Sequence, residues 1–118
     1  MITETDFREF QYNVLGAKSR IVGDLILHGD AIVNSEIEGS IEVRGEGKLI
    51  LERGSHVTGR IKAFDIEVFG TVVGDIDCPG LVAIRSSARI QGSIKSGRLV
   101  IYPGAIVEME ISTQEPGV

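Results

Sequence analysis

A five-residue motif, apolar-x-Gly-x-apolar, recurs along the chain and constrains its fold more than any other feature. Its copies are centred on Gly23, Gly39, Gly59, Gly74, Gly92 and, with the glycine replaced, Met109. Successive centres lie 16, 20, 15, 18 and 17 residues apart, a period that indicates stacked short repeats. Each repeat is too short for a pair of helices and contains no helix-forming run, so we predict one coil of a β-solenoid per repeat.

The alternation of residues around each glycine supports strands. In the fourth copy Val72, Gly74 and Ile76 share one strand face, whereas Asp75 and Asp77 share the other. The glycine therefore has inward parity, and we expect it at a corner where a Cβ pointing into the inner angle would clash. Apolar residues of the same parity are expected to stack in ladders inside the solenoid: Ile21, Leu25, Ile37, Ile41, Val57, Ile61, Val72, Ile76, Ile90 and Ile94.

A second pattern precedes the corners. A short apolar strand and a turn lead into the glycine, as at residues 49–51 and at residues 99–101, which are followed by Tyr102-Pro103-Gly104. Pro-Gly suits a type II turn, because proline fixes φ and glycine supplies the positive φ that follows. Each coil is thus expected to hold two or three short strands and no helix, which gives an all-β solenoid of about six coils.

The bulk properties limit the classes of function. The 118-residue chain supports one domain, and we expect the solenoid to span residues 13–112 between flexible segments at 1–12 and 113–118. A net charge of −5 and a pI near 5.0 argue against nonspecific nucleic-acid binding. The single cysteine favours a reducing compartment, and we expect a cytoplasmic protein. No apolar run approaches the roughly 20 residues of a membrane span, and the first residues do not read as a signal peptide.

Few residues suggest catalytic chemistry. His28 and His56 each neighbour an inward residue and are expected to face solvent, whereas Cys78 is expected to be a small buried hydrophobe. Asp75 and Asp77 share an outward face, and such a pair can act as acid and base or bind a cation. Three of the four residues aligned with them on neighbouring coils are Lys or Arg, which would neutralise the pair. We therefore expect no catalytic, metal-binding or cofactor-binding residues and no enzymatic activity.

The same alignment brings four charged residues to one outward position. They are Glu42, Lys62, Asp77 and Lys95. Since neighbouring coils lie about 4.7–4.9 Å apart, we predict a ladder of alternating charge whose main effect is to fix the register between coils.

Longer segments of the chain resemble the bactofilin family. They are Ser19-Arg20-Ile21-Val22-Gly23-Asp24-Leu25, Ile37-Glu38-Gly39-Ser40-Ile41, Pro79-Gly80-Leu81-Val82-Ala83-Ile84 and Arg98-Leu99-Val100-Ile101-Tyr102-Pro103-Gly104-Ala105. The resemblance covers roughly residues 14–112 and implies a single right-handed, three-sided parallel β-helix. It also implies a bacterial cytoskeletal protein that polymerises end to end without nucleotide and helps to shape the cell envelope. Members of the family attach to the inner membrane through a short N-terminal segment or work with peptidoglycan-modifying enzymes. A C-terminal phenylalanine often helps polymerisation in the family, whereas this chain has no Phe after Phe69.

The ends of the array are the expected assembly surfaces. A solenoid exposes unpaired backbone groups at each end, and no helical pattern flanks this array to cap them. The candidate contact residues are Val14, Leu15, Ile21 and Leu25 at the N-terminal end, and Leu99, Ile101, Val107, Met109 and Ile111 at the C-terminal end. A methionine at the corner would clash in a closed coil, so we expect the last coil to open at Met109.

Half of the aromatic residues, Phe7, Phe10 and Tyr12, precede the repeats. Two interpretations stay open: the rings pack over the first coil, or they contact the inner membrane. The alternative function is an acyltransferase-like or carbonic-anhydrase-like enzyme on a trimeric left-handed β-helix. That fold needs a strict six-residue period and three histidines per site, and the chain has neither.

Overall fold

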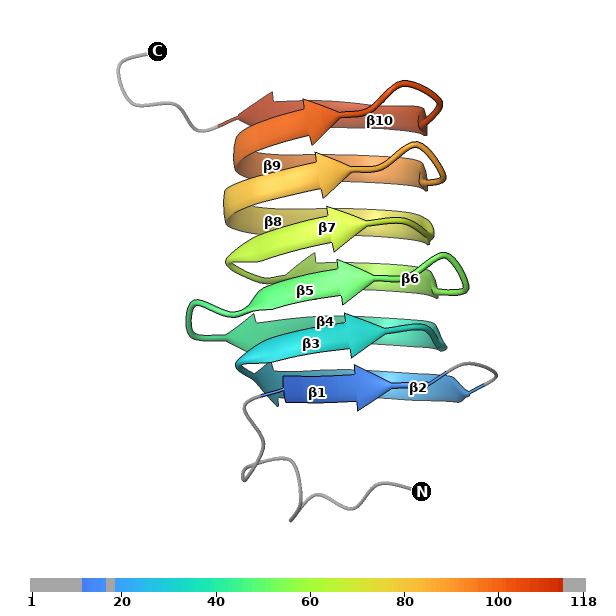
Figure 1. Cartoon of the computed structure of the whole chain (residues 1–118), viewed down its shortest axis with the longest axis vertical. Coiled ribbons are helices and arrows are strands. Elements are labelled where there is room, and N and C mark those ends of the chain that lie inside the picture. The colour runs from blue at the N-terminus through green and yellow to red at the C-terminus, as the bar shows by residue number, and fades with distance from the viewer. Residues whose placement is uncertain (1–11, 17–18, 114–118) are drawn as a thin grey trace.

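The computed structural model describes residues 12–16 and 19–113, with side chains described at 14–16 and 19–108. These residues form ten strands and no helix (Figure 1). The strands are β1 (Tyr12–Leu15), β2 (Arg20–His28), β3 (Asp30–Val33), β4 (Glu36–Arg44), β5 (Lys48–Leu51), β6 (His56–Lys62), β7 (Asp65–Val68), β8 (Thr71–Ile84), β9 (Arg89–Ile101) and β10 (Ile106–Thr113). The first strand begins one residue before the predicted array and the last ends one residue after it.

All of the strand pairs are parallel, and each coil pairs with the next one along the axis. The corner strands stack in the order β2, β4, β6, β8, β9 and β10, with successive motif centres aligned. The corner strands supply two walls, one on each side of the glycine corner. The remaining wall, which we call the third wall, consists of β1, β3, β5, β7 and the second halves of β8 and β9. Figure 1 shows this wall in front of the corner strands. The chain is therefore a parallel β-solenoid of about five turns, with six levels that we number as coils 1–6 from the N-terminus.

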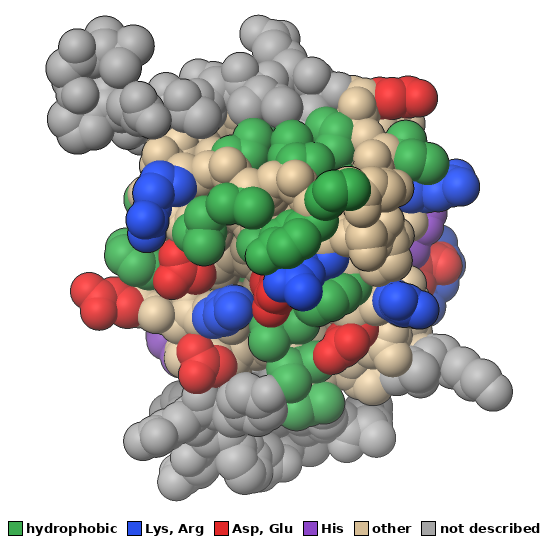
Figure 2. Space-filling view, turned by 45° about the horizontal axis from the view of Figure 1, so that its top comes forward, with side chains coloured by type: hydrophobic (Ala, Val, Ile, Leu, Met, Phe, Trp, Pro, Cys, Tyr) green, Lys and Arg blue, Asp and Glu red, His purple; other side chains and the backbone are tan. Residues whose placement is uncertain are grey.

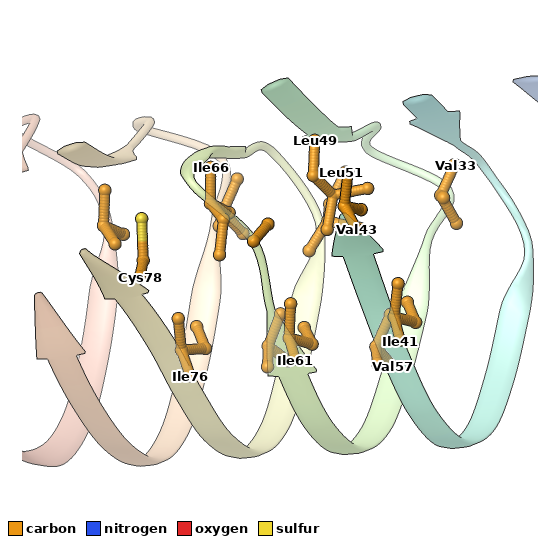
Figure 3. Close-up of a cluster of buried hydrophobic side chains, with 14 of the residues drawn as sticks. Val33, Ile41, Val43, Leu49, Leu51, Val57, Ile61, Ile66, Ile76 and Cys78 are labelled. Carbon is orange, nitrogen blue, oxygen red and sulfur yellow. The ribbon is translucent and has the colours of Figure 1, made fainter. Parts of the chain in front are cut away.

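The interior is filled by the predicted ladders. Of the ten inward residues that the alternation selects, eight are almost completely buried, and Ile21 and Leu25 of coil 1 are half-buried against the same core. Figure 3 shows Ile41, Ile61 and Ile76 stacked in this way on successive corner strands, facing Leu49 and Leu51 of the third wall. The core is aliphatic because a coil this narrow has no space for rings.

The glycines lie at corners, as predicted. The reason why these positions require glycine differs from the one that we expected. The five corner glycines have φ angles from 128 to 143°, a region that residues with a side chain rarely adopt. At Gly39 a Cβ would overlap the carbonyl oxygen of Gly23, and at Gly59 it would overlap that of Gly39. The clash is thus with the preceding coil along the axis, and not with the opposite wall inside the solenoid.

We expected the last coil to open at Met109, but it stays closed. The pairing of β10 with β9 runs from Ile106 to Thr113 without a register shift, and Met109 lies opposite Gly92. No further coil stacks on this level among the described residues, so the backbone of this corner is restricted by a neighbour on one side only.

A network of polar and aromatic side chains crosses the coils where the third wall ends. The Arg85 guanidinium lies 5.4 Å from the centre of the Phe69 ring and 4.2 Å from the centre of the Tyr102 ring. It also donates to Glu67 at 3.1 Å, and Lys48 lies 3.3 Å from the same carboxylate. These contacts join coils 3–6 and help to hold their register.

Candidate functional site

The C-terminal end presents the inner ladders to solvent. Leu99 and Ile101 continue the ladders of Val82 and Ile84, and Val107 continues that of Ile90. The inner-coil members are at most 2% exposed, whereas Ile101 is 45% exposed and the other two end residues are half-buried. Figure 2, tilted so that this end comes forward, shows hydrophobic side chains gathered there. The end of the core is thus uncovered among the residues described.

The N-terminal end is less open. Ile21 and Leu25 are half-buried, while Ile37 and Ile41, their partners in coil 2, are buried. Leu15 is buried with 6% exposure, so it adds little to the surface of this end. Val14 is 52% exposed but points outward from the third wall, because it has the opposite parity to Leu15.

The backbone edges at both ends are also unpaired within the described chain. The strand β2 pairs with β4 alone, β1 pairs with β3 alone, and β10 pairs with β9 alone. Each of these strands therefore has one edge with N–H and C=O groups that no described neighbour satisfies. Such edges accept a further strand with the same spacing.

Several predicted contact residues lie outside the described parts. Phe7 and Phe10 precede the first described residue, and the side chain of Tyr12 is not described. Met109 and Ile111 are described by their backbone only, which pairs with Gly92 and Ile94.

The residues with catalytic potential occupy the expected places. His28 and His56 are exposed, and Cys78 is buried with its Sγ donating to the carbonyl of Phe64 at 3.1 Å. Burial raises the pKa of the Cys78 thiol to about 11. Asp75 accepts a hydrogen bond from the Ser93 hydroxyl at 2.6 Å. Among the described side chains, no three His, Cys, Asp or Glu residues gather closely enough to hold a metal ion.

The four residues of the charge ladder lie in the predicted register, but their side chains do not contact one another closely. Glu42, Lys62, Asp77 and Lys95 lie opposite one another on coils 2–5. Within the described residues no ion pair closes between them, and Glu42 instead accepts from Arg44 at 2.8 Å. This hydrogen bond lowers the pKa of the Glu42 carboxyl, and the charge of Lys62 lowers it further.

Comparison with known proteins assigns the architecture to a family. The family model described as "Bactofilin: Polymer-forming cytoskeletal" matches residues 13–112. The chain belongs to the bactofilin family. It is 27% identical to Bactofilin BacO of Myxococcus xanthus over 92 residues, which cover 78% of this chain and 71% of that protein. No solved structure matches the chain.

Membership of the bactofilins makes this a polymer-forming cytoskeletal protein and not an enzyme. The alternative of an acyltransferase-like or carbonic-anhydrase-like trimer is not favoured. Among the residues described, no helix is long or apolar enough to cross a bilayer.

The sequence patterns described above do not predict one surface of this bactofilin. The outward positions of the third wall form a row that we call the apolar row: Val14, Ile32, Ile50, Ala83 and Val100, with Glu67 between the third and fourth of them. A signal for it was present, because residues 31–33, 49–51 and 99–101 are unbroken apolar triplets. A strand that is apolar at consecutive positions is typically covered on both faces.

Proposed function

We propose that this bactofilin polymerises end to end through its end coils, without nucleotide, into filaments that serve as a scaffold at the cell envelope. The observation that carries the proposal is the exposure of Leu99, Ile101 and Val107 at one end, where the same ladders are buried in every inner coil. Stacking another chain on this end would cover the ladders and pair the free edge of β10. Burying one large aliphatic side chain from full exposure contributes about 1.5–3 kcal/mol. These three residues are already partly buried, so covering them contributes only a part of that amount each.

The substitution Val107→Asp tests this contact. It would place a carboxylate without a partner in every junction, and burying such a charge costs several kcal/mol. We expect a folded, β-rich protein that no longer sediments at high speed. Met109→Arg is a second variant at the same end, at a position of which the structure describes the backbone only.

Ile106→Asp is the matched control. Ile106 lies next to Val107 on β10 but has outward parity, opposite Arg89, and is 46% exposed. Ile106→Asp adds the same charge to the same coil, but this side chain lies on the outer, exposed face and not in the covered core of the junction, so its filaments should persist. Filaments of normal length in the Val107→Asp protein would refute end-to-end contact through this face.

We also propose a cytoplasmic location with peripheral attachment to the inner membrane through Phe7, Phe10 and Tyr12. Two or three aromatic rings bind a bilayer weakly, but a filament presents many copies. Co-sedimentation with liposomes should be lost when residues 1–12 are removed. Equal sedimentation of the full and shortened chains would reject attachment through these rings.

Peptidoglycan-modifying enzymes are the partner class that we propose for the filament. The support is the resemblance to the bactofilin family, which implies work with such enzymes at the cell envelope. Recovery of such an enzyme with wild-type filaments, but not with the Val107→Asp protein, is the expected outcome of a pull-down.

A further inference from the structure

The third wall carries an outward apolar row that its neighbours lack. Val14 and Val100 are 52% and 43% exposed, and Ile32, Ile50 and Ala83 are half-buried. The outward rows of the corner strands are mostly polar over the same coils. One of them contains Val22, Glu38, Thr58, Val73, Gln91 and Glu108, and another contains Ile26, Glu42, Lys62, Asp77 and Lys95. Outward positions of a solvated sheet are usually polar, so an apolar row along a whole wall indicates a covered surface.

The only charged member of this row on the described wall is compensated. The Glu67 side chain is 16% exposed and lies within 3.3 Å of Lys48 and 3.1 Å of Arg85. Its charge is therefore already paired when another surface approaches, which reduces the cost of removing water from it. Figure 2 shows the hydrophobic side chains continuing from the end of the molecule down the adjoining wall, with charged side chains among them.

We propose that the third wall packs against the third wall of a second copy of this chain in a neighbouring filament. Filaments then associate side by side through their apolar rows. This inference rests on the proposed end-to-end assembly, because the row begins at Val14 in coil 1 and ends at Val100 in coil 6. Stacking of chains would join successive rows into one continuous apolar stripe.

The size of the wall explains why the pairing needs filaments. Six coils about 4.8 Å apart and strands of four residues give a face of roughly 300 Å², well below the roughly 800 Å² per partner of a stable interface. Two isolated chains would separate readily. Filaments repeat the contact in every subunit, so many weak contacts act together.

The charges favour an arrangement in which the solenoid axes of the two chains run in opposite directions. In that arrangement coil 3 of one chain faces coil 4 of the other, which brings Lys48 opposite Asp65 twice and sets Ile50 against the compensated Glu67. If the axes ran in the same direction, coil 3 would face coil 3, and Lys48 would no longer lie opposite Asp65 of the other chain.

The substitution Ile32→Glu tests the pairing. It places a carboxylate in the row between Val14 and Ile50, neither of which offers it a partner. Ala83→Lys is a second variant, whose ammonium lies beside Glu67 in its own chain and so is compatible with folding. Gln91→Glu is the matched control, because it adds one charge at an exposed position on a different wall.

Filaments are compared by negative-stain microscopy and by sedimentation at low speed, which collects bundles, and at high speed, which also collects single filaments. Wild-type and Gln91→Glu proteins should form bundles. Ile32→Glu and Ala83→Lys should form single filaments, with the low-speed pellet reduced at least about tenfold because every repeat loses its contact.

Any other outcome refutes the proposed contact between the third walls of two filaments. Bundles that persist in both row variants exclude the third wall, and an equal loss in Gln91→Glu shows a general effect of charge. Single wild-type filaments that sediment with phosphatidylcholine vesicles, and lose this property in Ile32→Glu, would assign the wall to a lipid surface. If the wild-type protein forms only single filaments, the lateral contact alone is refuted. If it forms no filaments, end-to-end assembly is refuted as well.

Discussion

The corner glycines give the sharpest test of how the coils fit together. Gly59 and Gly23 have similar backbones, with φ angles of 142° and 128°. A Cβ at Gly59 would overlap the carbonyl oxygen of Gly39, whereas a Cβ at Gly23 would meet nothing within 4 Å. The substitutions Gly59→Ala and Gly23→Ala therefore share the conformational strain and differ in the clash between coils.

The magnitudes follow from this difference. Placing a side chain in a φ region that only glycine adopts costs about 1–3 kcal/mol, and this applies to both variants. The reduced entropy of the unfolded chain offsets about 0.4–1 kcal/mol in both. At Gly59 the coils must also separate locally, which loses about two backbone hydrogen bonds at roughly 1 kcal/mol each. We expect Gly59→Ala to be less stable than Gly23→Ala by at least about 2 kcal/mol.

Urea unfolding followed by circular dichroism measures the two free energies, with Val107→Asp as the common background so that filaments do not contribute. Leu27→Ala serves as a control, because Leu27 belongs to coil 1 and is buried. A loss of about 2–5 kcal/mol in that variant shows that coil 1 unfolds together with the rest. If Leu27→Ala is costly and the two glycine variants lose the same stability, the clash between coils is not what requires glycine.

Three further predictions concern the core and the surface. Ile76→Ala should cost about 2–5 kcal/mol in urea unfolding, because it opens a cavity between two buried ladder neighbours. Lys62→Glu would place three acidic side chains in a row, with a small loss of stability that rising salt removes; no loss at low salt would contradict the ladder. The Cys78 thiol loses its proton near its ordinary pKa of 9.0 when unfolded but near 11 when folded. Stability should therefore fall between about pH 9 and 11, and a Cys78→Ala protein should lack this fall.

Much of the fold was predictable because the repeat gives the same signal several times. The motif centres align one above another, and the inward parity about Gly74 is confirmed by the burial of Val72 and Ile76. A period of two along a strand determines the face of each residue once a single inward residue is known. The outward placement of His28 and His56 and the burial of Cys78 follow from the same rule and are confirmed.

The remaining features depend on contacts between coils, which alternation along a single strand does not contain. The direction of a Cβ at the corner depends on φ, so alternation alone predicts a clash in the interior, whereas the clash occurs along the axis. Val14 is apolar and lies early in the chain, which suggests the end of the array, although its parity places it on the outer face of the third wall. The apolar row appears only when strands 16–18 residues apart are aligned side by side.

The two proposed surfaces differ in strength, and the difference sets an order of assembly. A junction between ends covers Leu99, Ile101 and Val107 together with a free strand edge, so it can form between two chains. The third wall offers only about 300 Å² per chain, so it can act only when the junctions have already aligned many copies. Loss of the junction in Val107→Asp should therefore abolish filaments and bundles together, whereas a charge in the apolar row at Ile32 should abolish bundles alone. The reverse pattern, bundles or paired chains without filaments, would mean that the side wall is the primary contact and that the exposed ladder ends have another role.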